Sequence, residues 1–450
     1  MRFLLDREEI TVSVVGLGYV GSCVAASLAS NGVNVVGVDV DAHPVEEMEA
    51  GRCHLKEPGL PELVARGRAA GRLHATTDYS AISSADVVVV AVGTPVREDG
   101  TLVETQIRSA AAEAGRHLRR GQLLVFKSTV PPGTTRDLVV PLLESGGLTC
   151  GEDFGLAFCP ERLSQGSALA EIQELPVVVG GWDAESGAAA ARFWESRLGV
   201  RTVVCSSMEA AETVKLLNNW WIDHNIALAN ELARFCTSIG VDAMEVIAAT
   251  NEVPKGGGTI NVLSPGVGVG GSCLTKDPWM LWRSARDRGV HLGTVVSARG
   301  ANDAMPGYVA GLVTEGLDAL GTPAERARVA VIGLSFKNNT GDLRSTPTLP
   351  VVAALRDAGA DVAVFDPLAD PDEVRKTFGL EPSPSAEAAA TGAHCLAVLA
   401  WHDEFAALDM AALRRLTARE CLLLDGRAHF DDQTVESLTG LGFTYRGIGR

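Results

Sequence analysis

The stretch TVSVVGLGYVGSCVAASLASNGVNVVGVDV, residues 11–40, decides the fold. A short Val-rich run, an Ala-rich stretch and a second Val-rich run predict a strand, a helix and a parallel strand. Gly16, Gly18 and Gly21 form a GxGxxG pattern where the first strand meets the helix, and Asp39 follows 39 − 16 = 23 residues after Gly16. This spacing is typical of dinucleotide binding, where the backbone approaches a pyrophosphate and the carboxylate holds a ribose. The acidic Asp39 favours NAD over NADP; the alternative is a tight strand-to-helix turn without a ligand.

Similar apolar runs continue through the first 205 residues, separated by intervals of helical length. They are TVSVVG (11–16), NVVGVDV (34–40), DVVVVAV (86–92), LLVFKST (123–129), GLAFCP (155–160), VVVG (177–180) and TVVCS (202–205). Continuous apolar strands that alternate with helices predict parallel strands covered on both faces. We therefore expect an α/β fold with a doubly wound sheet, and a first domain over residues 1–205.

The middle of the chain has a helical pattern. Residues 209–239 contain neither Pro nor Gly and predict one long helix that ends before Gly240. Residues 254–273 are dense in Gly and predict an irregular loop that approaches a ligand or another backbone segment. A second alternating block contains RVAVIGLSF (328–336), DVAVFDP (361–367), HCLAVLAWH (394–402) and ECLLLDGR (420–427). We expect a helical middle domain over 206–305 and a second α/β domain over 306–450.

Composition and charge exclude several classes of protein. The 450-residue chain is 46% hydrophobic and 21% charged, and it has no apolar run long enough to span a membrane. Asp6, Glu8 and Glu9 lie where a secretory signal needs an apolar core, so we expect a cytoplasmic protein. The net charge of −17 repels the phosphate backbone of nucleic acids. The nine cysteines form no CxxC pair, which predicts neither a disulfide framework nor a metal site.

Polar motifs follow several of the predicted strands. GTPV (93–96) and KSTVPPGTT (127–135) stand where a doubly wound sheet places cofactor and substrate, although ordinary turn chemistry explains either motif taken alone. Cys273 follows the Gly-rich GVGVGGS, and a thiol on such a loop is accessible as a nucleophile. Cys23 and Cys236 instead lie in apolar patterns that are typical of a core.

A polar trio interrupts the apolar pattern of the long helix. Lys215, Asn219 and Asp223 are spaced at i, i+4 and i+8, so they share one face. A solvated polar face is the ordinary explanation of such a trio. Asn218 and Asn219 are costly in mid-helix, however, and this local cost favours a functional role.

Together these motifs resemble the nucleotide-sugar 6-dehydrogenases, the family that contains UDP-glucose dehydrogenase and the UDP-N-acetylhexosamine dehydrogenases. The resemblance rests on VVGLGYVG, GTPV, KSTVPPGTT, CPERL, ETVKLLNN, GVGGSCLTKD and GLSFKNNTGDLRSTP, which follow the family's order along most of the chain. It implies two Rossmann-like domains joined by a long central helix, with NAD on the first domain and a nucleotide diphosphate sugar held between both. It also implies a homodimer formed through that helix, or a higher homo-oligomer.

The resemblance further implies two successive NAD-dependent oxidations of the sugar C6 alcohol to a carboxylate. By motif, Cys273 is the nucleophile that forms a thiohemiacetal and then a thioester. Lys215 and Asn219 match residues that stabilise developing oxyanions. The remaining catalytic positions are Asp277, an acid–base residue that works with ordered water, Glu161, implicated in thioester hydrolysis, and Thr129, which helps to hold the water.

The same resemblance assigns binding residues. The positions expected to bind the cofactor are Gly16, Gly18, Tyr19, Val20, Gly21, Asp39, Thr94, Ser128, Thr129 and Arg344, the last reaching the cofactor phosphates of a neighbouring chain. The positions expected to bind the substrate are Glu161, Arg162, Leu163, Lys215, Asn219, Gly270, Gly271, Lys337 and Arg427. The basic residues among them supply the local positive charge that the net charge of −17 lacks.

Three positions depart from the family pattern. Pro44 replaces the Arg or Lys expected against the adenine, Thr259 replaces an Arg that reaches a partner subunit in many N-acetylhexosamine enzymes, and Gln165 replaces a Glu common in UDP-glucose enzymes. The motifs leave open the sugar, glucose or N-acetylhexosamine, and the base, uracil or thymine. Two other functions compete: a two-electron hydroxyacid dehydrogenase of similar architecture and a non-catalytic nucleotide-sugar binding protein. The joint presence of the catalytic positions argues against both.

Overall fold

The computed structural model describes residues 9–256 and 258–450, which divide into two compact units. The first unit comprises the described residues up to Asn218 together with Trp279–His291, and the second comprises Asn219–Pro278 and Leu292–Arg450. Asp6 and Glu8, two of the acidic residues that argue against a secretory signal, lie outside the described residues. In the part of the chain that is described, no helix combines the length and the apolar character needed to cross a membrane.

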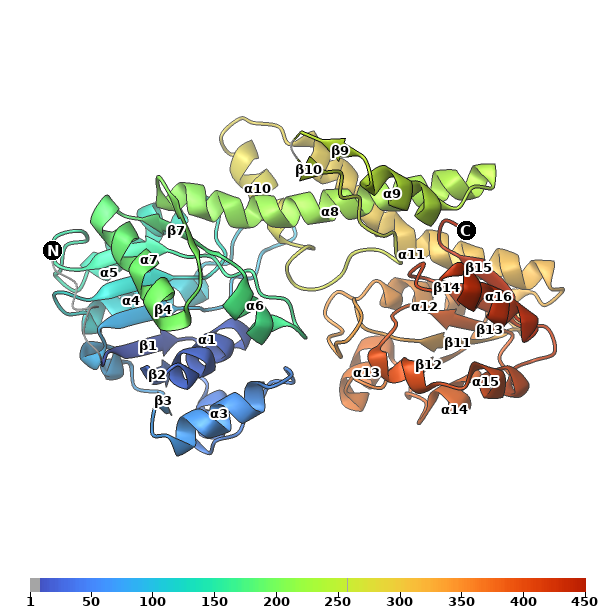
Figure 1. Ribbon diagram of the computed structural model, residues 1–450, viewed down its shortest axis with the longest axis horizontal. Helices are drawn as coiled ribbons and strands as arrows, with labels where there is room; N and C mark the ends of the chain where they lie inside the picture. Colours follow the sequence, from blue (N-terminus) through green and yellow to red (C-terminus); the bar gives the residue numbers. More distant parts are fainter. Residues whose placement is uncertain (1–8, 257) are drawn as a thin grey trace. The chain divides into compact units, whose positions relative to one another are not determined.

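The first unit is built on an eight-stranded sheet with the order β3-β2-β1-β4-β5-β6-β7-β8 (Figure 1). Its strands are β1 Thr11–Val15, β2 Asn34–Val38, β3 Leu73–Thr76, β4 Val87–Val90, β5 Leu123–Phe126, β6 Gly155–Phe158, β7 Val177–Gly181 and β8 Thr202–Cys205. The strands from β1 to β6 pair in parallel. The chain order reverses between β1 and β4, so the carboxyl ends of these two strands flank the usual ligand crevice of such a sheet.

Helices cover both faces of this sheet, as the doubly wound prediction requires. They are α1 Tyr19–Ser30, α2 Ala42–Glu49, α3 Leu60–Ala69, α4 Thr105–His117, α5 Val140–Glu144, α6 Ala168–Glu174 and α7 Ala184–Leu198. One core joins α1, α3 and α7 to the first face, and a second core joins α4 and α5 to the other. The α/β fold class predicted from the sequence is confirmed.

The direction of β7 differs from the prediction, because β7 runs antiparallel to β6. Ala157 pairs with Gly181 and Phe158 with Gly180, whereas β7 and β8 are parallel to each other. The segment 159–176 therefore stays at the carboxyl edge of the sheet instead of crossing a face to begin a parallel strand. This reversal keeps the CPERL motif beside the ends of the central strands.

The second unit contains a five-stranded parallel sheet with the order β12-β11-β13-β14-β15. Its strands are β11 Arg328–Ile332, β12 Asp361–Phe365, β13 Cys395–Val398, β14 Leu422–Asp425 and β15 Thr444–Gly447. Its α/β helices are α12 Thr348–Asp357, α13 Pro371–Phe378, α14 Ala386–Ala390, α15 Met410–Leu416 and α16 Asp432–Gly440. Here the order reverses between β11 and β13, so the carboxyl ends of these strands form the equivalent crevice.

The predicted long helix is α8 Met208–Ile239, and it ends before Gly240, whose φ is 69°. In the second unit its residues Ala233 and Cys236 share a core with α9 Ala243–Asn251 and α11 Gly293–Ala319. Helix α10 Asp277–Arg286 follows the Gly-rich loop. Apart from the short pair β9 Pro254–Lys255 and β10 Gly258–Thr259, the described residues of that loop form no strand. Asp223 of α8 pairs with Arg299 of α11 at 2.7 Å, and both side chains are buried. Asp223 thus holds two helices together, and the solvated-face explanation of the polar trio is wrong.

Candidate active site

The glycine loop after β1 has the three features that dinucleotide binding needs. Gly16 has a φ of 93°, and a Cβ there would lie 2.6 Å from the carbonyl oxygen of Ala91. A Cβ on Gly21 would lie 1.7 Å from the carbonyl oxygen of Gly16, so only glycine permits this close approach of strand and helix. A Cβ on Gly18 would meet no described atom within 4 Å. The backbone at Gly18 is therefore open to a ligand, whereas the other two glycines are needed for packing.

The residues around this loop fit NAD. α1 begins directly after Gly18, and in the described chain no side chain caps its first turn, so its backbone N–H groups can take a pyrophosphate. The Asp39 carboxylate follows β2 and accepts hydrogen bonds from the backbone N–H of Leu17 at 2.6 Å and of Asp41 at 2.9 Å. These two bonds fix the carboxylate beside the glycine loop, where it can accept the hydroxyls of a ribose.

Glu57 is a buried carboxylate that the sequence reasoning missed. It accepts the hydroxyl of Tyr19 at 2.6 Å and the backbone N–H groups of Gly166 at 2.7 Å and Ala168 at 2.9 Å. Burial and the hydrogen bond to Glu57 raise the pKa of Tyr19. The first helical turn of α1 is thereby tied to the loop that follows β6, which carries the CPERL motif. The EPGL sequence around Glu57 resembles ordinary turn chemistry, so spacing alone gives no sign of this role.

The carboxyl ends of β4 and β5 carry further predicted residues. Thr94, Ser128 and Thr129 are buried, and the Ser128 hydroxyl donates to the carbonyl of Val92 at 2.8 Å. Lys127, which the sequence reasoning did not single out, is also buried: its Nζ donates to the carbonyl of Cys159 at 3.1 Å. Burial lowers the pKa of Lys127. A buried basic side chain therefore contacts the CPERL motif at Cys159.

Glu161 and Lys215 form a buried ion pair in the first unit. Lys215 Nζ lies 2.9 Å from Glu161 Oε1, and the side chains are only 6% and 11% exposed. Burial alone would raise the pKa of Glu161, but the charge and hydrogen bond of Lys215 outweigh it and hold the pKa below its usual value. The backbone N–H of Leu163 also donates to Glu161, at 2.9 Å. The Arg162 guanidinium donates to the carbonyl of Pro176, so it braces this loop.

Glu212, which lies one turn before Lys215 on α8, is also a buried carboxylate. It accepts the backbone N–H groups of Gly133 at 2.6 Å and Thr135 at 2.9 Å, in the KSTVPPGTT motif. Burial raises the pKa of Glu212 to about 7, although these hydrogen bonds act in the opposite direction. Glu212 thus attaches the segment after β5 to α8 and titrates near neutral pH.

In the second unit, Cys273 lies on the turn that leads into α10. Cys273 is exposed, unlike the core residues Cys23 and Cys236, as predicted. Its carbonyl accepts the backbone N–H of Asp277 at 2.8 Å, so the thiol stands one turn before the helix.

Asn219 and Asp277 are joined in the same unit. Asn219 Nδ2 donates to Asp277 Oδ2 at 2.6 Å, and both side chains are buried. Lys276 Nζ pairs with the other carboxylate oxygen of Asp277. The amide of Asn219 is thus hydrogen-bonded to a carboxylate that lies four residues after Cys273 in the sequence. Within residues 9–256 and 258–450, no group of three His, Cys, Asp or Glu side chains is arranged to hold a metal ion.

Gly270 and Gly271 attach the cysteine loop to the second sheet's loops. A Cβ on Gly270 would lie 2.6 Å from both the Cβ of Phe336 and the carbonyl oxygen of Ser345, and Gly271 has a φ of 81°. The backbone N–H of Gly271 donates to the carbonyl of Arg344 at 3.1 Å. The pKa of Arg344 is raised mainly by its hydrogen bonds to Asp342, and also by the nearby Cys273. Arg344 therefore lies within electrostatic range of the cysteine.

The basic residues predicted to bind substrate or cofactor share a backbone feature. Among the described non-glycine residues, a positive φ occurs at Asn339, Ser345 and Ala428, which follow Lys337, Arg344 and Arg427 by one or two positions. The Arg427 Nε donates to the carbonyl of Leu399 at 2.8 Å and its Nη2 to that of Phe336 at 2.6 Å. Burial lowers the pKa of Arg427 to about 10. Such strained loops are found at functional sites, where the surrounding contacts maintain them.

Three consecutive stretches of the chain match one family. Residues 10–197 match the NAD binding domain of the UDP-glucose/GDP-mannose dehydrogenase family, residues 209–304 match its central domain, and residues 330–432 match its UDP binding domain. The chain belongs to this family. It is therefore an NAD-dependent nucleotide-sugar dehydrogenase, and the enzyme class and the cofactor predicted from the sequence are confirmed.

Relatives of this family align along almost the whole chain. A UDP-N-acetyl-D-mannosamine dehydrogenase of Pyrococcus horikoshii is 32% identical over 98% of this chain and 99% of the relative. A UDP-glucose 6-dehydrogenase of Haloferax volcanii is 36% identical over 92% of this chain and 96% of the relative. The solved structure of UDP-D-ManNAc dehydrogenase from Pyrococcus horikoshii has a TM-score of 0.86 at 30% identity, over 98% and 99% of the two chains. That of a UDP-glucose dehydrogenase from Pyrobaculum islandicum has a TM-score of 0.85 at 30% identity, over 99% and 98%.

The departures from the family pattern occupy varied surroundings. Pro44 is buried in α2, Thr259 is exposed in β10, and Gln165 is half-buried in the loop after β6. Relatives named for N-acetylmannosamine and for glucose are both similar to this chain.

Proposed function

We propose that the protein oxidises the C6 hydroxymethyl group of a nucleotide diphosphate sugar to a carboxylate, through a thiohemiacetal and a thioester on Cys273. The substrate is a UDP- or dTDP-glucose or a UDP-N-acetylhexosamine. NAD, when bound at the glycine loop, accepts one hydride in each of the two oxidations. The observation that supports the proposal best is the exposed thiol of Cys273 on the turn that also presents Asp277, with the carboxylate of Asp277 hydrogen-bonded to Asn219.

The thiol carries the carbon through the second oxidation. The Cys273 thiolate adds to the C6 aldehyde, and the new C–S bond leaves an alkoxide that takes up a proton, giving the thiohemiacetal. Loss of the C6 hydride and the hydroxyl proton gives the thioester. Water then adds to the thioester carbonyl, the C–S bond breaks and the thiolate leaves, so each catalytic cycle regenerates Cys273.

The charged groups assist these steps. Lys215 and Asn219 donate to the oxygen that becomes negative in the tetrahedral species, with a cation in one case and an amide in the other. Asp277 exchanges the proton of the C6 oxygen with water, and Thr129 helps to hold that water. Glu161, kept ionised by Lys215, accepts a proton from the water that hydrolyses the thioester.

The test measures stoichiometry and the covalent intermediate. NADH formation is screened with UDP-glucose, UDP-GlcNAc, UDP-ManNAc, dTDP-glucose and GDP-mannose, and we expect two NADH per sugar consumed. Cys273→Ser should bind NAD and the sugar normally but not turn over, because serine is far harder to ionise than a thiol. Cys205→Ser, at a half-buried cysteine on β8, is the matched control and should retain activity. One NADH per sugar with free aldehyde, or a Cys273→Ala variant with wild-type turnover, would exclude the thioester route.

We also propose that residues 206–305 act as a dimerisation domain between the α/β domains 1–205 and 306–450, with α8 packed against its twin. Trp221, Leu228, Phe235 and Ile239 are 48%, 50%, 60% and 54% exposed. Their spacing of seven, seven and four residues puts them on one face of α8, as in a coiled-coil seam. An exposed apolar stripe of this length is typical of an interface.

Sedimentation tests the dimer. The wild-type chain should sediment as a dimer or a higher oligomer at micromolar concentration, and Leu228→Glu should release monomers because it places a charge in the seam. Leu416→Glu is the control, since Leu416 is 39% exposed but lies on α15, outside residues 206–305. A wild-type monomer at this concentration would contradict the proposal.

A further inference from the structure

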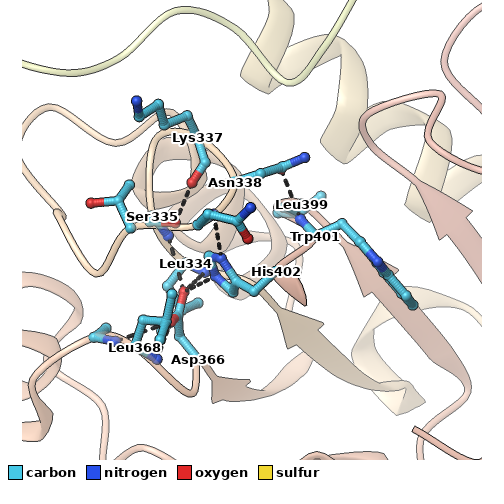
Figure 2. A network of polar contacts seen from close by, with 12 residues as sticks. Leu334, Ser335, Lys337, Asn338, Asp366, Leu368, Leu399, Trp401 and His402 are labelled. Atoms are coloured by element: carbon cyan, nitrogen blue, oxygen red, sulfur yellow. Dashed lines mark hydrogen bonds and ion pairs between the residues drawn. The ribbon is translucent and has the colours of Figure 1, made fainter. Parts of the chain in front are cut away.

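A polar network lies at the carboxyl ends of β11 and β13, where the order of the second sheet reverses (Figure 2). Its centre is the buried carboxylate of Asp366, directly after β12. Asp366 Oδ2 accepts a hydrogen bond from the backbone N–H of Leu334 at 2.7 Å. The same oxygen lies 3.0 Å from the ring nitrogen Nε2 of His402, with which it is hydrogen-bonded. Asp366 Oδ1 accepts the backbone N–H groups of Leu368 at 2.9 Å and Ala369 at 3.0 Å. Burial alone would raise the pKa of Asp366, but the hydrogen bonds from His402 and the backbone outweigh it and lower the pKa.

The same arrangement occurs in the first sheet, with one difference. There the backbone N–H of Leu17 donates to Asp39 at the end of β2, and here that of Leu334 donates to Asp366 at the end of β12. Both loops begin with a glycine of positive φ, Gly16 and Gly333. The carboxylate of Asp39 can accept hydrogen bonds from the hydroxyls of a ribose, whereas Asp366 is hydrogen-bonded to the imidazole of His402. In the second sheet, the carboxylate at this position therefore binds a side chain of the protein itself.

His402 connects this carboxylate to the loop that carries Lys337. The backbone N–H of Asn339 donates to His402 Nδ1 at 2.9 Å. Because Nδ1 accepts this bond, the ring hydrogen lies on Nε2 and is donated to Asp366. The imidazole is fully buried and uses both of its nitrogens. One side chain therefore links the end of β12 to the loop after β11.

Further hydrogen bonds hold the backbone of the Lys337 loop on both sides. The Ser335 hydroxyl donates to the carbonyl of Lys337 at 2.8 Å, and the backbone N–H of Trp401 donates to Asn338 Oδ1 at 2.9 Å. Asn339 has a φ of 57°, and its Oδ1 accepts the backbone N–H of Asp403 at 2.9 Å. Figure 2 shows the Lys337 side chain pointing away from the Asp366–His402 pair while its backbone faces the network. These contacts fix the backbone from which the Lys337 side chain extends.

We propose that His402 and Asp366 are a positioning pair, which fixes the 334–339 loop so that Lys337 meets the diphosphate of the nucleotide sugar. This inference rests on the proposed function, because it assigns Lys337 to that substrate. An ammonium on a flexible stem binds a phosphate best when its backbone is already fixed, since less conformational freedom is then lost on binding. A histidine that served only the stability of the sheet would not change the affinity for the ligand.

The experiment measures the affinity for UDP by titration calorimetry with saturating NAD. His402→Gln keeps an amide donor for Asp366 but removes the acceptor for the Asn339 N–H. We expect the Kd for UDP to rise about tenfold, the loss that one hydrogen bond gives. Asn339→Gly retains the backbone conformation and removes only the contact to Asp403, so it should fold and raise the Kd about threefold. With the sugar that the enzyme oxidises, the KM should rise in parallel and kcat should change by less than about twofold.

Two comparisons separate positioning from a structural role. His394 also accepts a backbone N–H on its Nδ1, from Arg328 at 3.1 Å, but it lies at the opposite end of β13. His394→Asn should leave the Kd for UDP unchanged. In a Lys337→Met background, His402→Gln should add no further loss, because the two residues act on one contact.

The outcomes distinguish this inference from the proposed function. If the wild-type enzyme binds UDP and oxidises nucleotide sugars but His402→Gln and Asn339→Gly bind UDP normally, the inference alone is overturned. An equal loss on His402→Gln with and without Lys337 would also overturn it. If the wild-type enzyme neither binds UDP nor oxidises any nucleotide sugar, the proposed function falls and this inference with it.

Discussion

Replacing Lys215 by methionine should reverse the pH dependence that Glu161 gives to the stability of the protein. In the wild type the pKa of Glu161 lies below its usual value of 4.5, because Lys215 outweighs burial. Its contribution to stability is therefore present above pH 4.5 and is lost as the pH falls through the folded-state pKa. Without the ammonium group, burial remains and the pKa in the folded state rises above 4.5.

The size of the effect follows from the cost of keeping this carboxyl neutral. An unpaired buried charge costs about 3–5 kcal/mol. Protonation of the carboxyl limits this cost to about 1 kcal/mol for each pH unit above its ordinary pKa of 4.5. The limit is therefore about 3 kcal/mol at pH 7 and about 1 kcal/mol at pH 5.5. The Lys215→Met variant should therefore lose stability as the pH rises from 5.5 to 7, while the wild type does not lose stability through this group.

Urea unfolding at pH 5.5, 6.25 and 7 measures these values. The double variant Lys215→Met/Glu161→Gln carries neither charge and should recover most of the loss at pH 7. Arg108→Met, which breaks an exposed pair with Glu104 on α4, is the control and should cost less than about 1 kcal/mol at every pH. Equal pH slopes in the wild type and in Lys215→Met would refute the reasoning, because they would show that Lys215 does not hold Glu161 ionised.

Three further outcomes test the remaining groups. Asp39→Asn keeps an oxygen that accepts the N–H of Leu17 but removes the charge that repels a 2′-phosphate. The ratio of kcat/KM for NAD to kcat/KM for NADP should therefore fall by about tenfold or more. An unchanged ratio would contradict the role of Asp39. Gly18→Ala should weaken NAD binding by about tenfold or more with an unchanged Tm, whereas Gly21→Ala should lower the Tm, because only the latter Cβ meets the backbone. The Glu212 pKa of about 7 predicts that this group removes about 3 kcal/mol of stability as the pH rises from 4.5 to 7, since the unfolded carboxyl ionises first. Unfolding of Glu212→Gln should lack that fall, and a slope identical to that of the wild type would show that Glu212 does not titrate there.

Local periodicity predicted the architecture well. Continuous Val-rich runs at intervals of helical length indicated two doubly wound sheets, and a run of 31 residues without Pro or Gly indicated the long helix. The strands β3 and β15 were missed because LHAT and TYRG are four residues long and too polar to give an apolar run. The antiparallel direction of β7 was missed as well, because a strand has the same composition in either direction and only the course of the loop 159–176 decides it.

Motif spacing located the glycine loop, Asp39, the CPERL segment and the cysteine loop, since each of these features is confined to a few consecutive residues. The requirement for glycine at Gly16 and Gly21 arises from neighbouring backbone, so the short motif VVGLGYVG is enough to predict it. Spacing on the long helix also showed that Lys215 and Asn219 share a face. It gave no sign of whether that face meets water or protein, because burial depends on what packs against the helix.

Only the tertiary structure decided which charges are paired. Glu161 and Lys215 are 54 residues apart, Asn219 and Asp277 are 58 apart, and Asp366 and His402 are 36 apart. Glu57, Lys127 and His402 have no motif of their own, and each acquires a role from partners that come from other elements. The sequence by itself thus determined the fold class, the dinucleotide fingerprint and the candidate nucleophile, which depend on neighbouring residues. The tertiary structure determined the protonation and placement of the charged groups, because the pKa of a group depends on burial and on partners that only folding brings near.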